Sequence, residues 1–505
     1  MNRKLLLIAV ALLAGQFTVR AEVQPHPLFT DGAVLQRDVS VPVWGKAKSG
    51  EQVTIEFCGQ TAKATADAEG KWKVSLKKLK AGGPFTMVIR GENTITLTNV
   101  CVGEVWVCSG QSNMGFTLNS ADNAAAAIAA SADPQLRLFK VPNVTADTPQ
   151  YSVNAAWVVS ATNTTPSFTA VGYFFGRDLR KALGVPVGLI MTAWGGSYAE
   201  AWTDRATLEK VCPAAFDRYK ESINEKSLAN YEKTLQNVKK VQANFKAAVA
   251  KAKAEGKPAP KPPRTPEDPR TTKNRPCVLF NAMLAPLQPF AIRGAIWYQG
   301  ESNAGRSKEY QTLFPAMIAN WRATWGLGDF PFFFVQIAPY QGQPPEIREA
   351  QLISWQKTPN TAMAVVTDHG EAADIHPKAK EPVGQRLALA ARALTYGEKI
   401  EYSGPVFKKM KVSGDKAVLS FDHLGGGLVA KDGALKGFTI AGAAATGASN
   451  NFVKADAVIV GDTVVVSSPE VKKPVAVRYG WANVPEVNLF NKADLPATPF
   501  RTDVE

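Results

Sequence analysis

The sequence has few of the residues that bind transition metals. It contains four histidines and five cysteines among 505 residues, and neither a C-x-x-C pair nor another metal-ligand spacing occurs. We therefore expect a protein without a metal site or cofactor.

Cys212 and Cys277 flank a basic segment, and in an oxidising compartment a disulfide between them would close the base of that segment. Two buried free thiols are the alternative.

Long hydrophobic runs are also missing. After residue 21 no run approaches the about 20 apolar residues that a membrane-spanning helix needs, so we expect no membrane insertion. Residues 1–21 have the pattern of a secretory signal peptide: Arg3 and Lys4 precede an apolar run at 5–13, and Val19-Arg20-Ala21 forms a cleavage site. We expect a periplasmic or secreted protein.

Acidic residues are too few to balance the basic ones, which leaves a net charge of +14. By itself this surplus favours nucleic acid, an acidic polymer or a membrane surface as partner. Its distribution argues against that interpretation, because residues 1–21 carry +3, residues 233–275 carry +9 and the remainder carries only +2. We interpret the surplus as the solvated lysine face of one insertion and expect no nucleic-acid partner. An anionic-polymer binder that uses this segment is the alternative, and on our interpretation the chemistry survives deletion of residues 233–275.

The residue patterns divide the chain into three folded regions, as its length suggests. Alternating apolar and polar residues predict a small antiparallel β domain over residues 22–100. Residues 101–400 alternate strand-like runs with helical patterns, which predicts an α/β domain with a parallel sheet. Short β-type segments predict a second β domain over residues 401–480, and we expect residues 481–505 to return to the core.

A helical, basic insertion interrupts the α/β region at about residues 215–276. From Phe216 to Glu255 apolar residues recur three to five positions apart, which predicts one apolar stripe on a helix. Forty helical residues would extend roughly 60 Å, so we expect an arm or a helical hairpin. The segment from Gly256 to Pro276 is rich in proline and lysine and predicts a solvated linker.

Three strand-like runs of the α/β region each end in a polar loop with residues suited to acyl transfer. Ser112 follows the first run, and a serine at the carboxyl end of a parallel strand is exposed as a nucleophile. Gly195 and Gly196 follow the second run, and Asn303 follows the third. The N–H of Ser112, the backbone at Gly196 and the amide of Asn303 would supply three donors to a tetrahedral oxyanion.

A serine nucleophile needs a base, and His376 is the candidate. Asp374 lies two positions before it and would orient the imidazole and stabilise its charged form. Asp368 and His369 form a competing pair in the same loop.

The residues around these positions form four blocks: GEVWVCSGQSNM, GLIMTAWGGS, AIWYQGESN and DIHP. In this order they resemble the sialate O-acetylesterase family of SGNH hydrolases, whose blocks supply serine, glycine, asparagine and histidine. The segments LFTDGAVLQRDVSVPVWG and RYGWANVPEVNLFNKADLPATPFRT resemble the opening and closing segments of that family, so the resemblance covers nearly the whole mature chain. It favours His376 over His369 as the base.

The resemblance implies a three-layer α/β/α SGNH-hydrolase core, flanked by small β-sandwich-like domains, that removes acetyl groups from sugars. It implies that Ser112 is the nucleophile, that His376 is the general base and then acid, and that Asp374 orients it. The implied oxyanion donors are the N–H of Ser112, Gly196 and Asn303, and the residues expected to shape the site are Gln111, Gln299 and Glu301.

The spacing of the third catalytic member departs from the wider SGNH pattern. There the aspartate usually precedes the histidine by three residues, whereas Asp374 precedes His376 by two. Glu371 or Asp368 as the orienting carboxylate, and a dyad supported by a backbone carbonyl, are therefore alternatives.

An acetylated sugar is the expected partner, and sialate is the substrate after which the family is named. Acetylated xylan or another hemicellulose is the alternative among esterases, and an inactive carbohydrate-binding protein is the alternative from another class. The carboxylate of sialic acid would suit a bidentate arginine, and Arg306, Arg348 and Arg386 lie near the blocks. The sequence does not indicate an oligomeric state.

Overall fold

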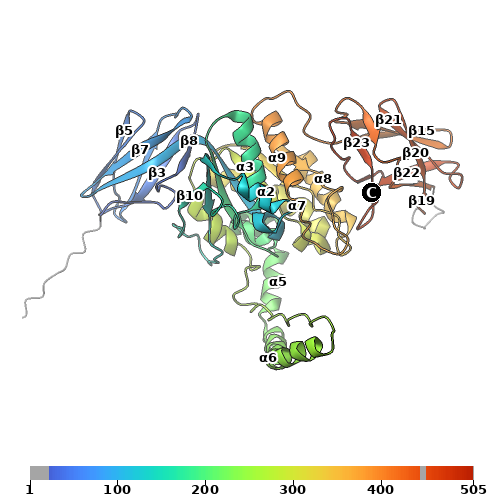
Figure 1. The fold of residues 1–505 in the computed structure, drawn as a ribbon, viewed down its shortest axis with the longest axis horizontal. Coiled ribbons are helices and arrows are strands. Elements are labelled where there is room, and N and C mark those ends of the chain that lie inside the picture. The colour runs from blue at the N-terminus through green and yellow to red at the C-terminus, as the bar shows by residue number, and fades with distance from the viewer. Residues whose placement is uncertain (1–21, 444–450, 504–505) are drawn as a thin grey trace, which may run out of the picture.

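The structure, a computed structural model, describes residues 22–443 and 451–503. Helices and strands alternate between residues 112 and 394, and the described residues before and after this region form strands, which confirms the prediction of a mixed α/β fold. Figure 1 shows strands gathered at both ends of an elongated molecule, a helix-rich centre between them, and a helical arm that projects from that centre. Among the described residues no helix is long and apolar enough to cross a membrane. The predicted signal peptide, residues 1–21, lies outside the described residues.

The centre holds a mostly parallel sheet with the strand order β10-β9-β11-β8-β12-β13-β14. Neighbouring strands from β9 to β14 are parallel, while β10 at one edge runs antiparallel to β9. β11, β12, β13 and β14 are buried along their whole length, as is typical of parallel strands covered on both faces. The strands are β8 Thr94–Gly110, β9 Asp133–Lys140, β10 Trp157–Ser160, β11 Val187–Ala193, β12 Gly294–Tyr298, β13 Phe332–Val335 and β14 Thr361–Ala364.

Helices pack on both faces of this sheet because successive strand residues point to opposite sides. Trp297 packs in one hydrophobic cluster with residues of α7 (Ser307–Trp325) and α8 (Pro345–Lys357). Its neighbour Ile296 packs in a second cluster with residues of α3 (Ala170–Leu183) and α9 (Glu381–Leu394). Shorter elements follow the strands: α1 Ser112–Gly115, η1 Leu118–Ser120, α2 Ala124–Ala129, η2 Ala199–Trp202, α4 Arg205–Val211, η3 Phe280–Leu284, η4 Ala285–Leu287 and η5 Glu301–Arg306.

One long strand, β8, joins the N-terminal β region to the central sheet. Its first half pairs antiparallel with β7, where Arg90 lies opposite Thr94, and its second half pairs in parallel with β11 and β12. The boundary predicted at residue 100 therefore falls within a continuous strand. The other N-terminal strands are β1 Gln24–Pro25, β2 Val34–Gln36, β3 Val41–Lys46, β4 Gln52–Phe57, β5 Gln60–Thr65, β6 Lys71–Leu76 and β7 Gly82–Arg90.

The C-terminal β segments form strands around a hydrophobic cluster of their own. They are β15 Val406–Ser413, β16 Lys416–Asp422, β17 Leu428–Ala430, β18 Phe438–Gly442, β19 Val453–Lys454, β20 Asp456–Val460, β21 Thr463–Ser467, β22 Pro474–Tyr479, β23 Leu489–Asn491 and β24 Phe500–Arg501. The closing segment contributes β23 and β24 to these sheets. It also contacts the central region, because Arg501 donates a hydrogen bond to Glu349 of α8 at 2.7 Å.

The basic insertion forms an arm of two helices, α5 (Ala214–Ser222) and α6 (Glu225–Ala254). This agrees with the expected arm, in which the helical segment is divided at Asn224, whose side chain begins α6 by accepting a hydrogen bond from the N–H of Ser227 at 2.8 Å. The chain then returns along α6, where Gln242 donates a hydrogen bond to Thr265 at 3.0 Å.

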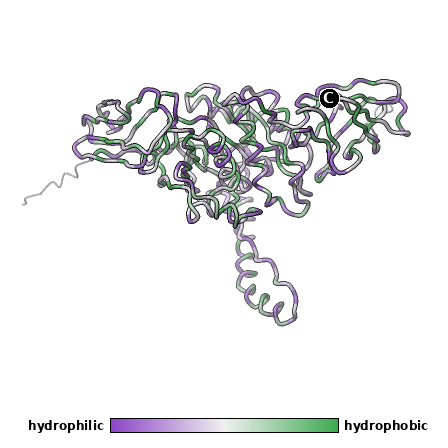
Figure 2. The backbone as a smooth tube through the Cα atoms, turned by 45° about the horizontal axis from the view of Figure 1, so that its top comes forward, coloured by the Kyte–Doolittle hydropathy of each residue, from purple (hydrophilic) through white to green (hydrophobic). Residues whose placement is uncertain are grey.

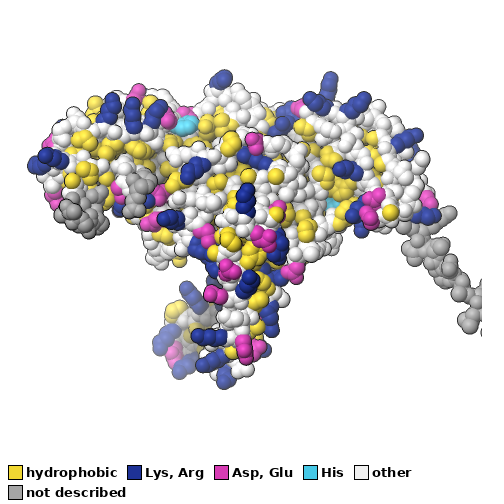
Figure 3. All heavy atoms as spheres, turned by 180° about the vertical axis from the view of Figure 1, so that it is seen from behind, with side chains coloured by type: hydrophobic (Ala, Val, Ile, Leu, Met, Phe, Trp, Pro, Cys, Tyr) yellow, Lys and Arg dark blue, Asp and Glu magenta, His cyan; other side chains and the backbone are white. Residues whose placement is uncertain are grey.

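The surface of the arm is largely polar. Its apolar stripe is half-buried except at Val241, which is exposed, and no residue of α6 is fully buried. Figure 2 shows hydrophobic and hydrophilic segments interspersed through the body of the molecule, and Figure 3 shows Lys and Arg side chains clustered on the arm. The predicted lysine surplus therefore lies on an exposed projection.

The cysteines at the base of the arm are not bridged. Cys212 and Cys277 are buried free thiols, so the structure has the second of the two predicted alternatives. Burial raises the pKa of Cys212 to about 11 and that of Cys277 to about 12. Both thiols are therefore protonated and unreactive at neutral pH.

We expect the outer part of the arm to contribute little to the stability of the fold. Residues 224–266 supply no member of the three hydrophobic clusters, and the flanking residues Ser222 and Glu267 line one cavity. Replacing residues 224–266 by a short Gly/Ser linker should therefore change Tm by less than about 4 °C in a calorimetric scan. Loss of cooperative unfolding would contradict this expectation.

Candidate active site

Ser112 begins α1 directly after β8 ends. Gly110, the last residue of β8, pairs in register with Ala193 of β11 and Tyr298 of β12, so the loops after three neighbouring strands start at the same level. Gly110 has a φ of +136°, and a Cβ there would lie 2.2 Å from the carbonyl oxygen of Tyr298. Glycine is therefore required at this position. The structure places Ser112 at the carboxyl edge of the sheet.

His376 reaches Ser112 from the loop between β14 and α9. Its Nε2 lies 2.8 Å from Oγ of Ser112, a hydrogen-bond distance. Asp374 accepts a hydrogen bond from the backbone N–H of His376 at 2.9 Å, and its carboxylate lies 3.6 Å from Nδ1 of the imidazole. The second distance is that of an ion pair and is too long for a hydrogen bond. The structure thus brings Ser112, His376 and Asp374 together.

The alternative carboxylates are engaged elsewhere. Asp368 accepts two hydrogen bonds from the guanidinium of Arg386, at 2.7 and 2.6 Å, and pairs with His369 at 3.4 Å. Glu371 accepts a hydrogen bond from the backbone N–H of Lys378 at 3.1 Å. Of the three carboxylates, Asp374 is the one that contacts His376.

The side chain of Asn303 cross-links the loops after β11 and β12. Its Oδ1 accepts hydrogen bonds from the N–H of Ala199 at 3.0 Å and from Gln299 at 2.7 Å. Its Nδ2 donates to Glu200 at 2.8 Å. These three contacts fix the orientation of the amide, which has a second N–H to donate.

The turn after β11 places Gly195 against Ser112. A Cβ on Gly195 would lie 3.2 Å from the Cβ of Ser112. Gly196 has a φ of +72°, and its carbonyl oxygen accepts a hydrogen bond from Asn274 at 3.0 Å. Asn274 belongs to the return segment of the insertion. A deletion of residues 233–275 would remove Asn274 and with it this contact to the turn.

Three residues predicted to shape the site are buried. Gln111 accepts a hydrogen bond from the N–H of Ser302 at 3.3 Å, and Gln299 accepts one from the hydroxyl of Tyr310 at 3.0 Å. Glu301, the third, is part of a buried charged cluster.

That cluster joins the segment of the serine to the segment of the histidine. Lys380 donates a hydrogen bond to Oδ1 of Asn113 at 2.6 Å. The amide of Asn113 donates to Glu301 at 2.6 Å and to the carbonyl of Ile375 at 3.0 Å. Asn113 directly follows the serine and Ile375 directly precedes the histidine. Sequence reasoning missed Lys380, which lies in none of the four blocks.

Burial changes the protonation of these groups. It lowers the pKa of Lys380 to about 7 and raises the pKa of Glu301. Burial also lowers the pKa of His376; the charge of Lys380 acts in the same direction and that of Asp374 opposes it. His376 is therefore neutral at neutral pH, which is the form that accepts a proton.

The three arginines near the blocks all have partners within the protein. Arg306 donates a hydrogen bond to Glu200 at 2.6 Å. Arg348 is buried and bonds backbone carbonyls of the C-terminal region, and Arg386 pairs with a carboxylate. Sequence reasoning also missed Glu200, whose carboxylate joins Arg306 to Asn303. Its position in the sequence, close after Gly195 and Gly196, could have indicated a role at the site.

Metal-ligating side chains do not gather in the described part of the chain. No group of three or more His, Cys, Asp and Glu residues there is arranged to hold an ion.

Comparisons with known proteins identify related carbohydrate esterases. A family model described as a carbohydrate esterase, sialic acid-specific acetylesterase, matches residues 276–393, a range that includes Asn303 and His376. Sialate O-acetylesterase of Mus musculus is 33% identical over 435 residues, which are 77% of this chain and 77% of that protein. Sialate O-acetylesterase of Homo sapiens is 30% identical over 438 residues, which are 77% of this chain and 74% of that protein.

A solved structure extends the similarity to nearly the whole chain. The crystal structure of a carbohydrate acetylesterase from Xanthomonas citri matches with a TM-score of 0.80 and 38% identity, covering 96% of this chain and 100% of that chain. The protein described here is therefore a carbohydrate esterase and belongs to the sialate O-acetylesterase family.

Proposed function

We propose that this protein is a serine esterase that removes O-acetyl groups from carbohydrate through an acetyl-serine intermediate. The observation that carries the proposal is the 2.8 Å contact between Oγ of Ser112 and Nε2 of His376 at the carboxyl edge of the parallel sheet. A serine hydroxyl in contact with a neutral imidazole is the arrangement that activates a serine nucleophile.

Acyl transfer would proceed in two steps. Ser112 attacks the acetyl carbonyl while His376 takes the hydroxyl proton, and His376 then donates that proton to the departing sugar hydroxyl. In the second step His376 takes a proton from water, the resulting hydroxide attacks the acetyl-serine, and acetate leaves as the proton returns to Ser112. The charge of Asp374 favours the imidazolium that forms in each step.

We assign the oxyanion donors to the N–H of Ser112, the N–H of Gly196 and the second amide N–H of Asn303. The fixed orientation of the Asn303 amide and the packing of the glycine turn on Ser112 support this assignment. Each donor is expected to lower the barrier by about 3 kcal/mol.

Sialate is the first candidate substrate, because the relatives from Mus musculus and Homo sapiens are named sialate O-acetylesterases. Acetylated xylan or another hemicellulose is the second candidate. It is favoured by the pairing of Arg306, Arg348 and Arg386 within the protein, since a sialic acid carboxylate would have to compete with their existing partners. The contact between Ser112 and His376 favours an active enzyme over an inactive carbohydrate-binding protein.

We also propose a three-layer core with flanking β domains and a periplasmic or secreted location. Helices on both faces of the parallel sheet support a three-layer α/β/α SGNH-hydrolase core, and the strands at the two ends of the molecule support flanking β domains. The signal-peptide pattern of residues 1–21 supports a periplasmic or secreted location.

Acetate release from O-acetylated sialic acid and from acetylated xylan, measured in parallel, tests the function and separates the substrates. We expect the wild-type protein to release acetate and Ser112→Ala to lower kcat by about 10⁶-fold, because the nucleophile is lost. Undiminished acetate release by a folded Ser112→Ala protein would refute the nucleophile assignment. Preference for xylan would keep the mechanism and replace sialate as substrate.

The contribution of Asp374 is expected to be modest. An orienting aspartate that is buried and hydrogen-bonded to the histidine contributes about 10⁴-fold to kcat. Asp374 is exposed and lies 3.6 Å from Nδ1, so we expect Asp374→Ala to lower kcat by only about tenfold. Steady-state kinetics of Asp374→Ala and Asp374→Asn check this, and a loss comparable to that of Ser112→Ala would contradict it.

The buried Lys380 is expected to influence the titration of His376. The acid limb of the kcat/KM profile should lie below pH 6.5 in the wild-type protein, because the pKa of His376 is lowered. In Lys380→Met this limb should move to higher pH, since removal of a neighbouring cation stabilises the imidazolium. Lys380→Arg keeps the charge and should stay closer to wild type. An acid limb at the same pH in a folded Lys380→Met protein would be inconsistent with this role.

A further inference from the structure

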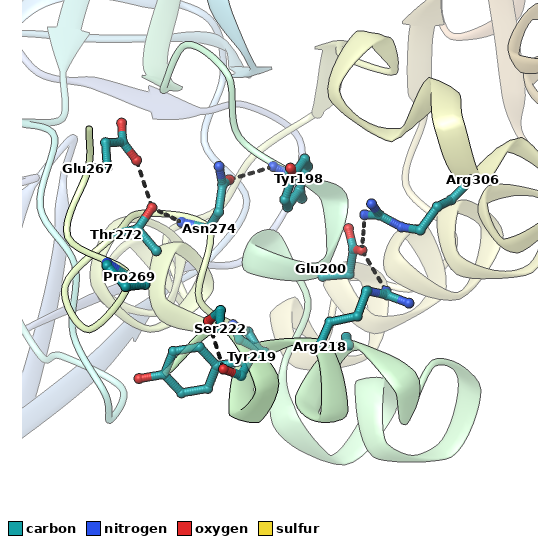
Figure 4. Close-up of a pocket in the computed structure, with 12 residues that line it drawn as sticks. Tyr198, Glu200, Arg218, Tyr219, Ser222, Glu267, Pro269, Thr272, Asn274 and Arg306 are labelled. Carbon is teal, nitrogen blue, oxygen red and sulfur yellow. Dashed lines mark hydrogen bonds and ion pairs between the residues drawn. The ribbon is translucent and has the colours of Figure 1, made fainter. Parts of the chain in front are cut away.

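A cavity of about 370 Å³ lies at the base of the arm, next to the proposed oxyanion residues. Its walls come from the turn after β11, from α5, from the return segment of the insertion and from the end of η5 (Figure 4). This volume is within the range of small-molecule sites. Ser112 and His376 do not line the cavity, so it is distinct from the reaction centre.

Two residues of its wall connect the cavity to the reaction centre. Glu200 accepts the amide hydrogen bond of Asn303 at 2.8 Å. Asn274 donates to the carbonyl of Gly196 at 3.0 Å and accepts a hydrogen bond from the N–H of Tyr198 at 2.9 Å. The residues that hold the proposed oxyanion donors thus also form the wall of the cavity.

The charged residues of the lining are paired with one another or with close neighbours. Figure 4 shows Arg218 and Arg306 converging on Glu200, whose side chain is buried. The pairs are Glu200 with Arg306 and Arg218, Arg218 and Arg306 with Glu309, and Glu267 with Lys273. These three basic and three acidic groups leave the cavity without net charge.

The uncharged part of the lining combines flat rings with hydrogen-bonding groups. Tyr198 and Tyr219 supply aromatic rings, and the guanidinium of Arg306 lies 4.8 Å from the centre of the Tyr198 ring. The hydroxyl of Thr272 donates to Glu267 at 2.7 Å and keeps a lone pair that can accept a hydrogen bond, and the amide of Asn274, which bonds Gly196 and Tyr198, keeps a second N–H to donate. A sugar ring has apolar faces and hydroxyl groups along its edge, which such a lining matches.

We propose that this cavity binds a neutral glycosyl unit linked to the acetylated sugar, and that it makes the enzyme prefer acetylated neutral oligosaccharides over acetylated monosaccharides. The inference rests on the proposed function, because Ser112 defines where the acetylated sugar is held. An anionic residue would have to compete with Glu200 and Glu309 for the guanidinium groups, with two carboxylates close by. A neutral ring leaves these ion pairs intact.

Tyr219 is suited to test the proposal, since its ring lines the cavity and it belongs to none of the hydrophobic clusters. The measured quantity is the ratio of kcat/KM for an acetylated xylotriose to kcat/KM for an acetylated methyl xyloside. We expect Tyr219→Ala to lower this ratio roughly tenfold, mainly through KM, and Tyr219→Phe to preserve it. Tyr231→Ala on α6 is the matched control, since Tyr231 does not line the cavity.

Binding of unacetylated xylotriose to the Ser112→Ala protein, measured by calorimetry, tests the cavity without turnover. We expect Tyr219→Ala to weaken this binding and Tyr231→Ala to leave it unchanged. That result would support the site even if the wild-type protein released no acetate, and only the proposed function would then fail. The opposite result is that the protein releases acetate but Tyr219→Ala changes neither the kcat/KM ratio nor the binding constant for xylotriose. That result would overturn the cavity assignment and leave the proposed function intact.

Discussion

The register of β8 between β11 and β12 is the constraint on which the active site depends. Because Gly110 is level with the last residues of both neighbours, the loops that carry Ser112, Gly196 and Asn303 leave the sheet at one point. When neighbouring parallel strands end at the same level, the residues that follow them lie close together although they are distant in sequence, and no flexible loop is needed to bring them into contact. The close approach of Gly110 to the carbonyl of Tyr298 shows how tightly this junction is packed.

The proposed base, His376, comes from a loop, and a buried polar cluster joins that loop to the sheet. Burying Lys380 and Glu301 removes both from water, which is unfavourable unless hydrogen bonds compensate. Asn113 provides these bonds by accepting from Lys380 and donating to Glu301, and its amide also holds the backbone beside His376. Burial lowers the pKa of His376, so the imidazole is neutral at neutral pH, and the charge of Lys380 acts in the same direction.

The insertion divides into two parts with different physical character. Its outer part, α6 and the segment that returns along it, is exposed and lysine-rich. At its base the charges are paired, and Asn274 holds the turn that contains Gly196. Near the reaction centre, the basic residues of the insertion are therefore neutralised by acidic partners. The net charge of the whole chain consequently says little about the charge of the substrate.

Local residue order was sufficient to predict the mixed α/β fold and the position of Ser112 after an apolar strand, because strand and loop patterns depend on neighbouring residues. The pairing of Ser112 with His376, 264 positions apart, was predicted from the family blocks and could not follow from spacing. The helix break at Asn224, the buried Lys380 and the role of Glu200 were missed. Burial and choice of hydrogen-bond partner arise only when distant segments pack together, so the tertiary structure decided them.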